Sequence, residues 1–292
     1  MGSKLRMSYG LLGAVSLWLV MAPAGPAVAD NQPNRIRIEY DPPKNPAHQP
    51  IYEMIKERRV LEKMQTIFSP FKFPGDVTIK ATGCDGHANA WYARPTLTIC
   101  YEYLEEIRRD MPTETTATGV TPVDGEIGQF FFAVAHEMGH AAFDMFNTPI
   151  FGRQEDAADN FATYIMLQFG KSDARRLIAG AAYSYRKYLQ HPTVTAPLKD
   201  FSDLHGAPQQ RFFNLICLAY GADPVLFADV VEKKMLPEHR ARGCRYEYGN
   251  VVWAFRQLIV PNLDKELAKQ VMDQTWLPPQ NPEQGSGTRA LQ

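Results

Sequence analysis

The sequence predicts an α+β fold, in which a small antiparallel sheet precedes a mostly helical body. Between residues 34 and 101, apolar side chains alternate in short segments bounded by glycine and proline, as they do in strands. After residue 102 the apolar residues recur at the spacing that is typical of helices. No internal repeat divides the sequence, so we expect a single domain over residues 30–276.

Residues 1–29 have the pattern of a signal peptide. Lys4 and Arg6 precede an apolar run over residues 11–21, which is too short to span a bilayer comfortably. Ala27-Val28-Ala29 then gives the small-residue pattern of a cleavage site. We expect an exported protein, periplasmic or secreted, that begins at Asp30 and has no membrane span in its mature chain. An uncleaved N-terminal anchor is the alternative.

Four segments account for the sheet and the first helix. Alternating apolar and charged residues predict a strand over residues 34–40. Helical spacing predicts one helix over residues 51–68, which ends before two prolines. Alternation of β-branched residues predicts two further strands, over residues 77–82 and 96–101, in a small antiparallel sheet.

The helical body is expected to centre on a helix over residues 127–146, with Asp124 as its candidate cap. This helix is apolar almost all round and should therefore be buried. The tail over residues 277–292 is rich in proline, glutamine, glycine and serine and is expected to be loose. The other predicted helices cover residues 103–109, 155–169, 172–189, 208–220, 223–233 and 247–258.

The charge balance argues against nucleic acid as a partner. The chain has 31 basic and 32 acidic residues, a formal net charge of −1. Such a balance provides no electrostatic footprint for nucleic acid or for an anionic membrane surface. The function must therefore be sought in a local site.

Four cysteines in an exported protein indicate disulfides before free thiols. Three pairings are possible, and we favour Cys84 with Cys100 and Cys217 with Cys244, because each pair closes a short loop. Four free, buried cysteines are the alternative. A site that binds a metal through all four is disfavoured, since no two of them have the C-x-x-C spacing.

His136, Glu137 and His140 form a His-Glu-x-x-His motif inside the apolar helix. Residues four apart lie on one helical face, so both imidazoles can reach one Zn²⁺ ion. Glu137 would then lie beside the metal, where it can act as the catalytic base rather than as a ligand. A pair of satisfied core histidines is the structural alternative.

A catalytic zinc normally has a third protein ligand, and Glu155 is the best candidate. Glu155 and Asp159 are four residues apart and therefore share a face of the next predicted helix, whereas Asp156 does not. Asp159 is then placed to accept the N–H of a ligating histidine and fix its tautomer. Alternatively, Glu155 and Asp156 merely favour the N-terminus of that helix.

His-Glu-x-x-His followed by Glu-x-x-Ala-Asp resembles the gluzincin metallopeptidases, in particular the prenyl-protein endopeptidases and their soluble periplasmic relatives. The resemblance implies a zincin-like fold, one Zn²⁺ ion and endopeptidase activity on a peptide or protein substrate. It also implies that an edge strand with Asn89, Ala90, Trp91 and Tyr92 pairs with extended substrate. Ordinary sheet packing is the alternative for Trp91 and Tyr92. The membrane helices of the prenyl-protein group are missing, so lipidated substrates are not expected.

The sequence is most similar to a family of exported bacterial metallopeptidases, and this similarity spans most of the mature chain. It rests on three further segments, which are residues 84–90, 210–212 and 244–248.

Amide hydrolysis also needs a donor for the developing oxyanion. His205 is the first candidate because it lies in a predicted loop, ahead of Arg211, Tyr246 and Tyr248; a surface histidine is the alternative. A secreted binding protein that keeps the metal without turnover is the second functional hypothesis, although Glu137 favours an enzyme. The remaining histidines lack ligand spacing and are expected to be exposed: His48, His87, His191 and His239.

Overall fold

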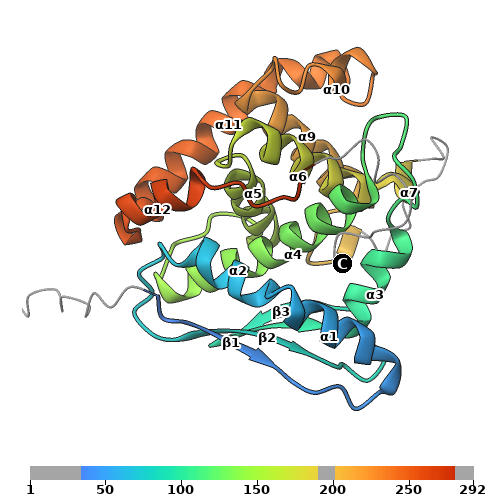
Figure 1. The fold of residues 1–292 in the computed structure, drawn as a ribbon. Helices are drawn as coiled ribbons and strands as arrows, with labels where there is room; N and C mark the ends of the chain where they lie inside the picture. The colour runs from blue at the N-terminus through green and yellow to red at the C-terminus, as the bar shows by residue number, and fades with distance from the viewer. Residues whose placement is uncertain (1–33, 190–200, 280–292) are drawn as a thin grey trace, which may run out of the picture. The chain divides into compact units, whose positions relative to one another are not determined.

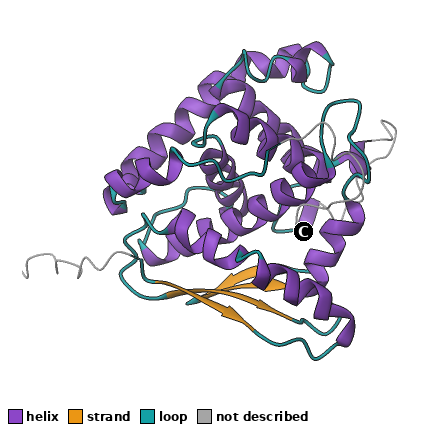
Figure 2. Cartoon of the chain, in the orientation of Figure 1, coloured by secondary structure: helices purple, strands orange, loops and turns teal. Residues whose placement is uncertain are grey.

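The structure is a computed structural model that describes residues 34–189 and 201–279. The signal peptide, its cleavage site and His191 lie outside these residues, as does most of the tail expected after residue 276. Within the described part of the chain, no helix is both long enough and apolar enough to cross a membrane. The fold is α+β, as predicted, with the strands in one sheet and helices making up most of the rest (Figures 1 and 2).

The sheet is mixed rather than antiparallel, which corrects the prediction. Its strand order is β1 (Ile36–Tyr40), β2 (Val77–Thr82), β4 (Thr96–Cys100) and β3 (Ala90–Ala93). β2 is parallel to both β1 and β4, and only β3 pairs antiparallel, with β4. The helical segment between β1 and β2 makes a crossover, which returns the chain in the same direction. β3 and β4 then form a hairpin that leaves β3 at the edge.

The single helix predicted over residues 51–68 is two helices, α1 (Gln49–Glu57) and α2 (Val60–Phe68). Arg59 separates them with a left-handed φ of 54°. The Tyr40 hydroxyl accepts a hydrogen bond from the Leu61 N–H at 2.9 Å, so a side chain from β1 satisfies one of the free donors at the start of α2. This contact with the sheet accompanies the break, and no glycine or proline marks it in the sequence.

The helices lie on one side of the sheet in the view of Figure 1. Along β2 the residues alternate between buried and half-buried, with Ile79 facing the helices and Lys80 on the opposite face. Lys80 Nζ lies 2.7 Å from an Asp41 carboxylate oxygen and 3.1 Å from one of Glu39, so this face carries an ion-pair cluster. The core therefore lies between the sheet and the helical body.

The helical body contains α4 (Pro122–Met145) at its centre (Figure 1). The side chain of Thr121, not Asp124, caps this helix by accepting the Asp124 N–H at 3.0 Å. Asp124 lies inside the helix instead, where its carboxylate pairs with buried Arg176 at 2.7 Å. The predicted cap was therefore wrong by one turn.

The other helices match the predictions to different degrees. α11 begins nine residues earlier than predicted. Its first turns are polar, so the apolar spacing did not indicate them. α12 was not predicted. Most of the predicted helix over residues 223–233 consists of turns. The bounds are α3 (Tyr101–Asp110), α5 (Gln154–Met166), α6 (Lys171–Ser184), α7 (Arg186–Leu189), α9 (Pro208–Ala222), α10 (Asp229–Glu232), α11 (Glu238–Leu258) and α12 (Lys265–Met272), with short 3₁₀ turns η1 (Pro46–His48) and η2 (Val260–Asn262).

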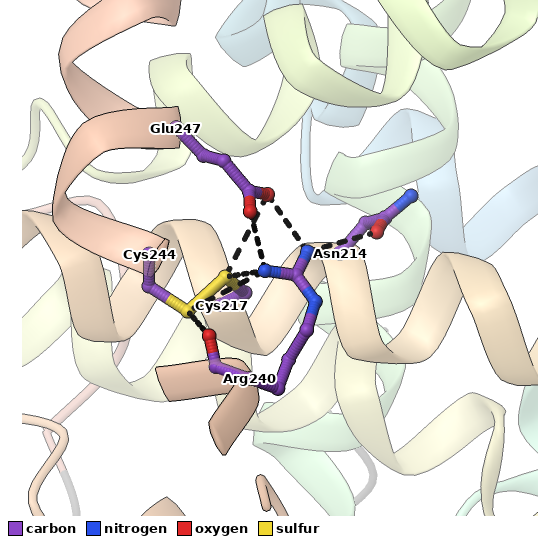
Figure 3. Close-up of a disulfide and its surroundings, with 5 residues drawn as sticks. All are labelled: Asn214, Cys217, Arg240, Cys244 and Glu247. Atoms are coloured by element: carbon purple, nitrogen blue, oxygen red, sulfur yellow. Dashed lines mark hydrogen bonds and ion pairs between the residues drawn. A yellow bond between two sulfur atoms is a disulfide. The ribbon is translucent and has the colours of Figure 1, made fainter. Parts of the chain in front are cut away.

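The disulfides follow the favoured pairing. Cys84 is bonded to Cys100, the last residue of β4, and Cys217 of α9 is bonded to Cys244 of α11. Figure 3 shows the second bridge beside Arg240, whose guanidinium contacts Cys217 Sγ at 2.8 Å and donates to Glu247 Oε2 at 2.7 Å. The first bridge spans β3, and the second spans α10.

The packed part of the chain extends beyond residue 276. Leu277 is buried, and the carbonyl of Pro278 accepts a hydrogen bond from Arg176 at 2.8 Å. These two residues had been assigned to the loose tail.

Candidate metal centre

Two consecutive helices bring three possible metal ligands together. His136 and His140, one turn apart on α4, have their Nε2 atoms 3.1 Å apart. Glu155, in the first turn of α5, places Oε2 3.0 Å from His136 Nε2 and 3.3 Å from His140 Nε2. One ligand atom from each residue lies within 4.8 Å of the others. The structure therefore brings together the three ligands predicted from the sequence.

A glycine in the motif allows α5 to approach α4 this closely. A Cβ atom at Gly139, inside the motif, would lie 3.2 to 3.3 Å from the side chain of Phe161, which is tighter than most packing contacts. The connecting loop reverses the chain with positive φ values at Asn147 (50°) and Gly152 (116°). Glycine in the motif thus serves the contact between the helices, and the loop sets the direction in which Glu155 points.

The described residues contain a second group of possible metal ligands, which differs from His136, His140 and Glu155 in the chemistry of its ligand atoms. That group is Cys84, Cys100 and Glu102. Its sulfurs are joined in a disulfide and are not thiolates, and the Glu102 carboxylate already accepts the N–H groups of Cys84 and Gly86. Two imidazoles and a carboxylate, in contrast, are available to one ion.

Asp159 orients His136. Its Oδ1 lies 2.8 Å from His136 Nδ1, and Arg211 donates to both of its oxygens, at 2.7 and 2.8 Å. Burial would raise the pKa of Asp159, but the hydrogen bonds from His136 and Arg211 lower it to about 2. An ionised carboxylate only accepts, so Nδ1 of His136 carries the proton and Nε2 faces the other ligands.

The three possible ligands affect one another's protonation. Burial would lower the pKa of His136, but hydrogen bonds to Asp159 and Glu155 outweigh it and raise this pKa to about 9. The hydrogen bond to His136 lowers the pKa of Glu155 to about 2. Burial, with the charge of His136, lowers the pKa of His140. His136 would therefore lose a proton when it binds a metal ion.

Glu137 is buried and is not one of these ligands. Burial raises its pKa to about 7, against the opposing effects of His136 and the backbone of Tyr92. A carboxyl group with such a pKa exchanges a proton near neutral pH, as a general base requires.

His205 lies beside the three ligands. Its Nε2 is 2.9 Å from Glu155 Oε2, and its ring is 5.6 Å from that of His136, centre to centre. Of the other candidate oxyanion donors, Arg211 is held by Asp159. Tyr246 is exposed, and Tyr248 stacks on Tyr164.

A cavity of about 290 Å³ opens beside the cluster, and His136, Glu137 and His205 line it. Asn89 and Ala90, from the predicted substrate segment, line it as well, whereas Trp91 and Tyr92 do not. The Tyr92 hydroxyl donates instead to Asp144 of α4 at 2.9 Å, which ties the edge strand to the motif helix. Trp91 is partly exposed on β3.

The sequence analysis missed most of the polar lining of this cavity, including Tyr103, Gln129 and Tyr185. Gln129 had a signal, because it lies seven residues before His136 and so on the same helical face. His48, predicted to be exposed, is buried against Tyr101, whereas His87 and His239 are exposed.

One family model matches the chain. It covers residues 40–259, is named DUF4344 and carries the description "Putative metallopeptidase". No curated protein and no solved structure matches the chain.

Proposed function

The chain belongs to this metallopeptidase family, and we propose that it is a zinc endopeptidase in which His136, His140 and Glu155 hold the metal. Two imidazole nitrogens and one carboxylate, with a fourth position left open, are a usual donor set of catalytic zinc. The observation that carries the proposal is the position of buried Glu137, which is next in sequence to the proposed ligand His136 and lines the same cavity as His136. A purely structural metal site needs no such group.

Zinc bound there would bring the pKa of a coordinated water to about 7. Glu137 would then accept the proton of the attacking water and could later donate it to the leaving amine. The pKa of about 7 that burial gives this carboxyl suits both steps. Asp159, held by Arg211, fixes the ring of His136 and would leave its Nε2 available to a metal ion.

His205 is the proposed donor to the oxyanion that develops on the substrate carbonyl. Its Nε2 lies 2.9 Å from Glu155 Oε2, so its ring reaches the position where the metal ligands converge. Its side chain is 42% exposed, which leaves it free to turn toward a bound peptide. Removal of an oxyanion donor typically costs about 10² to 10³ in turnover rate.

The edge strand β3 is the proposed guide for an extended substrate. One side of β3 pairs with β4, and its N-terminal end, with Asn89 before it, borders the cavity. Strand addition at such an edge holds a peptide through main-chain hydrogen bonds and tolerates varied side chains. Export after cleavage near Ala29 belongs to the same proposal, and two disulfides suit an oxidising compartment.

Glu137→Gln tests the proposal, because glutamine has the size of glutamate but cannot accept a proton. We expect hydrolysis of a complex peptide library to fall by about 10² to 10⁴-fold. Zinc content, measured by mass spectrometry of the metal, should stay at that of the wild type. Glu57→Gln, at an exposed position of α1, is the matched control and should retain full activity.

Activity of Glu137→Gln within about threefold of the wild type would show that Glu137 is not the base. If the wild type binds zinc and cleaves nothing in the library, the binding-protein hypothesis replaces the peptidase.

A further inference from the structure

The cavity beside Glu137 is larger than the reacting groups need, and it extends between α3, α4 and the C-terminal end of α6. Its walls include the apolar side chains of Ile107, Met111 and Phe132, which are largely buried. A peptide bond held at Glu137 would therefore have one of its flanking side chains next to this space. The residues that line this space therefore determine which substrate side chain can bind there.

Two polar side chains from different helices meet in this lining. Gln129 of α4 donates through Nε2 to the hydroxyl of Tyr103 of α3, at 2.8 Å. Gln129 Oε1 is buried and has no hydrogen-bond partner within the described ranges. The Tyr103 hydroxyl accepts from Gln129, so its own proton remains for another group. The pair thus offers one acceptor and one donor side by side.

Away from the metal centre, the charged groups that line the same space are in ion pairs: Glu106, Asp110, Lys187 and Arg211. Lys187 Nζ lies 2.9 Å from an Asp110 oxygen and 4.0 Å from one of Glu106. Arg211 is held by Asp159 through two hydrogen bonds. A charged side chain that entered the space would lose its hydration without gaining a free counter-ion, which is unfavourable.

We propose that this space is a specificity pocket for a side chain that ends in a carboxamide, glutamine or asparagine, next to the scissile bond. The carboxamide oxygen accepts from the Tyr103 hydroxyl, and its NH₂ donates to Gln129 Oε1. The apolar walls surround the methylene groups. This inference rests on the proposed peptidase function and adds the substrate class. It assigns Tyr103 and Gln129 to specificity and gives them no part in the bond-breaking step.

Peptides that differ only at one residue test the pocket. Glutamine, methionine, glutamate and lysine have similar lengths, and each is placed in turn on either side of the cleaved bond. We expect kcat/KM for glutamine to exceed that for methionine by at least about tenfold at one of the two positions, because a site that hydrogen-bonds its substrate rejects analogues lacking the group. Glutamate and lysine should be cleaved more slowly than glutamine.

Gln129→Leu and Tyr103→Phe remove the polar atoms and nearly conserve shape. Both variants should bring the ratio of kcat/KM for the glutamine peptide to kcat/KM for the methionine peptide to within about threefold. Gln168→Leu is the matched control, since the Gln168 side chain donates to the carbonyl of Tyr164 and is not among the residues that line the cavity. It should keep the preference of the wild type.

Binding separates this inference from the proposed function. Fluorescence anisotropy of the same peptides on zinc-loaded Glu137→Gln should show the glutamine preference even if the wild type cleaves nothing, and Gln129→Leu in that background should abolish it. Equal cleavage or binding of the glutamine and methionine peptides overturns the pocket. A glutamine preference that persists in both Gln129→Leu and Tyr103→Phe also overturns the pocket.

Discussion

At the scale of single residues, Glu137 and Asp159 show how surroundings assign different roles to buried carboxyl groups near His136. Burial raises the pKa of Glu137 to about 7. Burial acts in the same direction on Asp159, but the hydrogen bonds from His136 and Arg211 lower the pKa to about 2. Glu137 can therefore exchange a proton at neutral pH, while Asp159 remains an anion that orients His136.

Replacing Asp159 by asparagine should weaken zinc binding by about 10 to 100-fold, as other changes to groups that orient metal ligands do. The amide no longer carries the charge that fixes the His136 tautomer and that pairs with Arg211. Competition with a chromogenic chelator measures the affinity. Asp156→Asn is the control, because Asp156 pairs with Arg153 at a partly exposed position. An equal loss of zinc affinity in both variants would show that Asp159 has no special role in orienting His136.

Glu155→Ala should lower the zinc content of the purified protein strongly, because the site would lose its only carboxylate ligand. Asp156→Ala changes the neighbouring acidic residue of the same helical turn and should retain the metal. Metal analysis of the two variants side by side decides between them. If Glu155→Ala keeps its full zinc content and Asp156→Ala loses zinc, then Asp156 is the ligand and the assignment of Glu155 is wrong.

At the scale of elements, the close packing of α4 on its neighbours positions the site. A Cβ atom at Gly128 would lie 2.6 Å from the backbone oxygen of Leu177 on α6, and one at Gly180 would collide with the carbonyl oxygen of Asp124. Backbone atoms at these distances cannot move aside without separating the helices. Glycines thus hold α4 between α6 and α5, on which Glu155 lies.

Gly128→Ala should therefore destabilise the fold by about 1 to 3 kcal/mol, as overpacking of a core does. Gly249→Ala on α11 is the matched control, since a Cβ there meets nothing within 4 Å. Helix propensity alone favours alanine by about 1 kcal/mol, so this control should be neutral or stabilising. Urea unfolding measures both free energies, and equal values would show that the contact with α6 is unimportant.

At the scale of the whole molecule, two disulfides join elements on different parts of the fold. Cys84 and Cys100 are separated by 16 residues and Cys217 and Cys244 by 27. Loss of a bridge that closes a loop of this length should cost about 3 kcal/mol, because the unfolded chain regains conformational freedom.

Peptide mapping without reduction should find these two linked pairs in protein isolated from the cell envelope. Paired substitution of Cys84 and Cys100 by alanine should then lower the denaturant midpoint. Four alkylatable thiols in the native protein would contradict both bridges and weaken the case for export.

The sequence by itself determined the features that depend on local geometry. His136 and His140 share a face because a helix repeats every 3.6 residues, and Glu155 follows at the start of the next helix. The position of buried Glu137 and the α+β composition follow from the same periodicity. Such features can be predicted because they depend only on residues that are close together in the sequence.

Only the tertiary structure decided what depends on contacts between distant segments. The parallel pairing of β2 with β1 and β4, and the break at Arg59, follow from packing of helices on the sheet. The Tyr103–Gln129 pair joins α3 to α4, and His205 reaches Glu155 across 50 residues of chain. No local periodicity encodes these contacts, because they result from the mutual burial of whole faces.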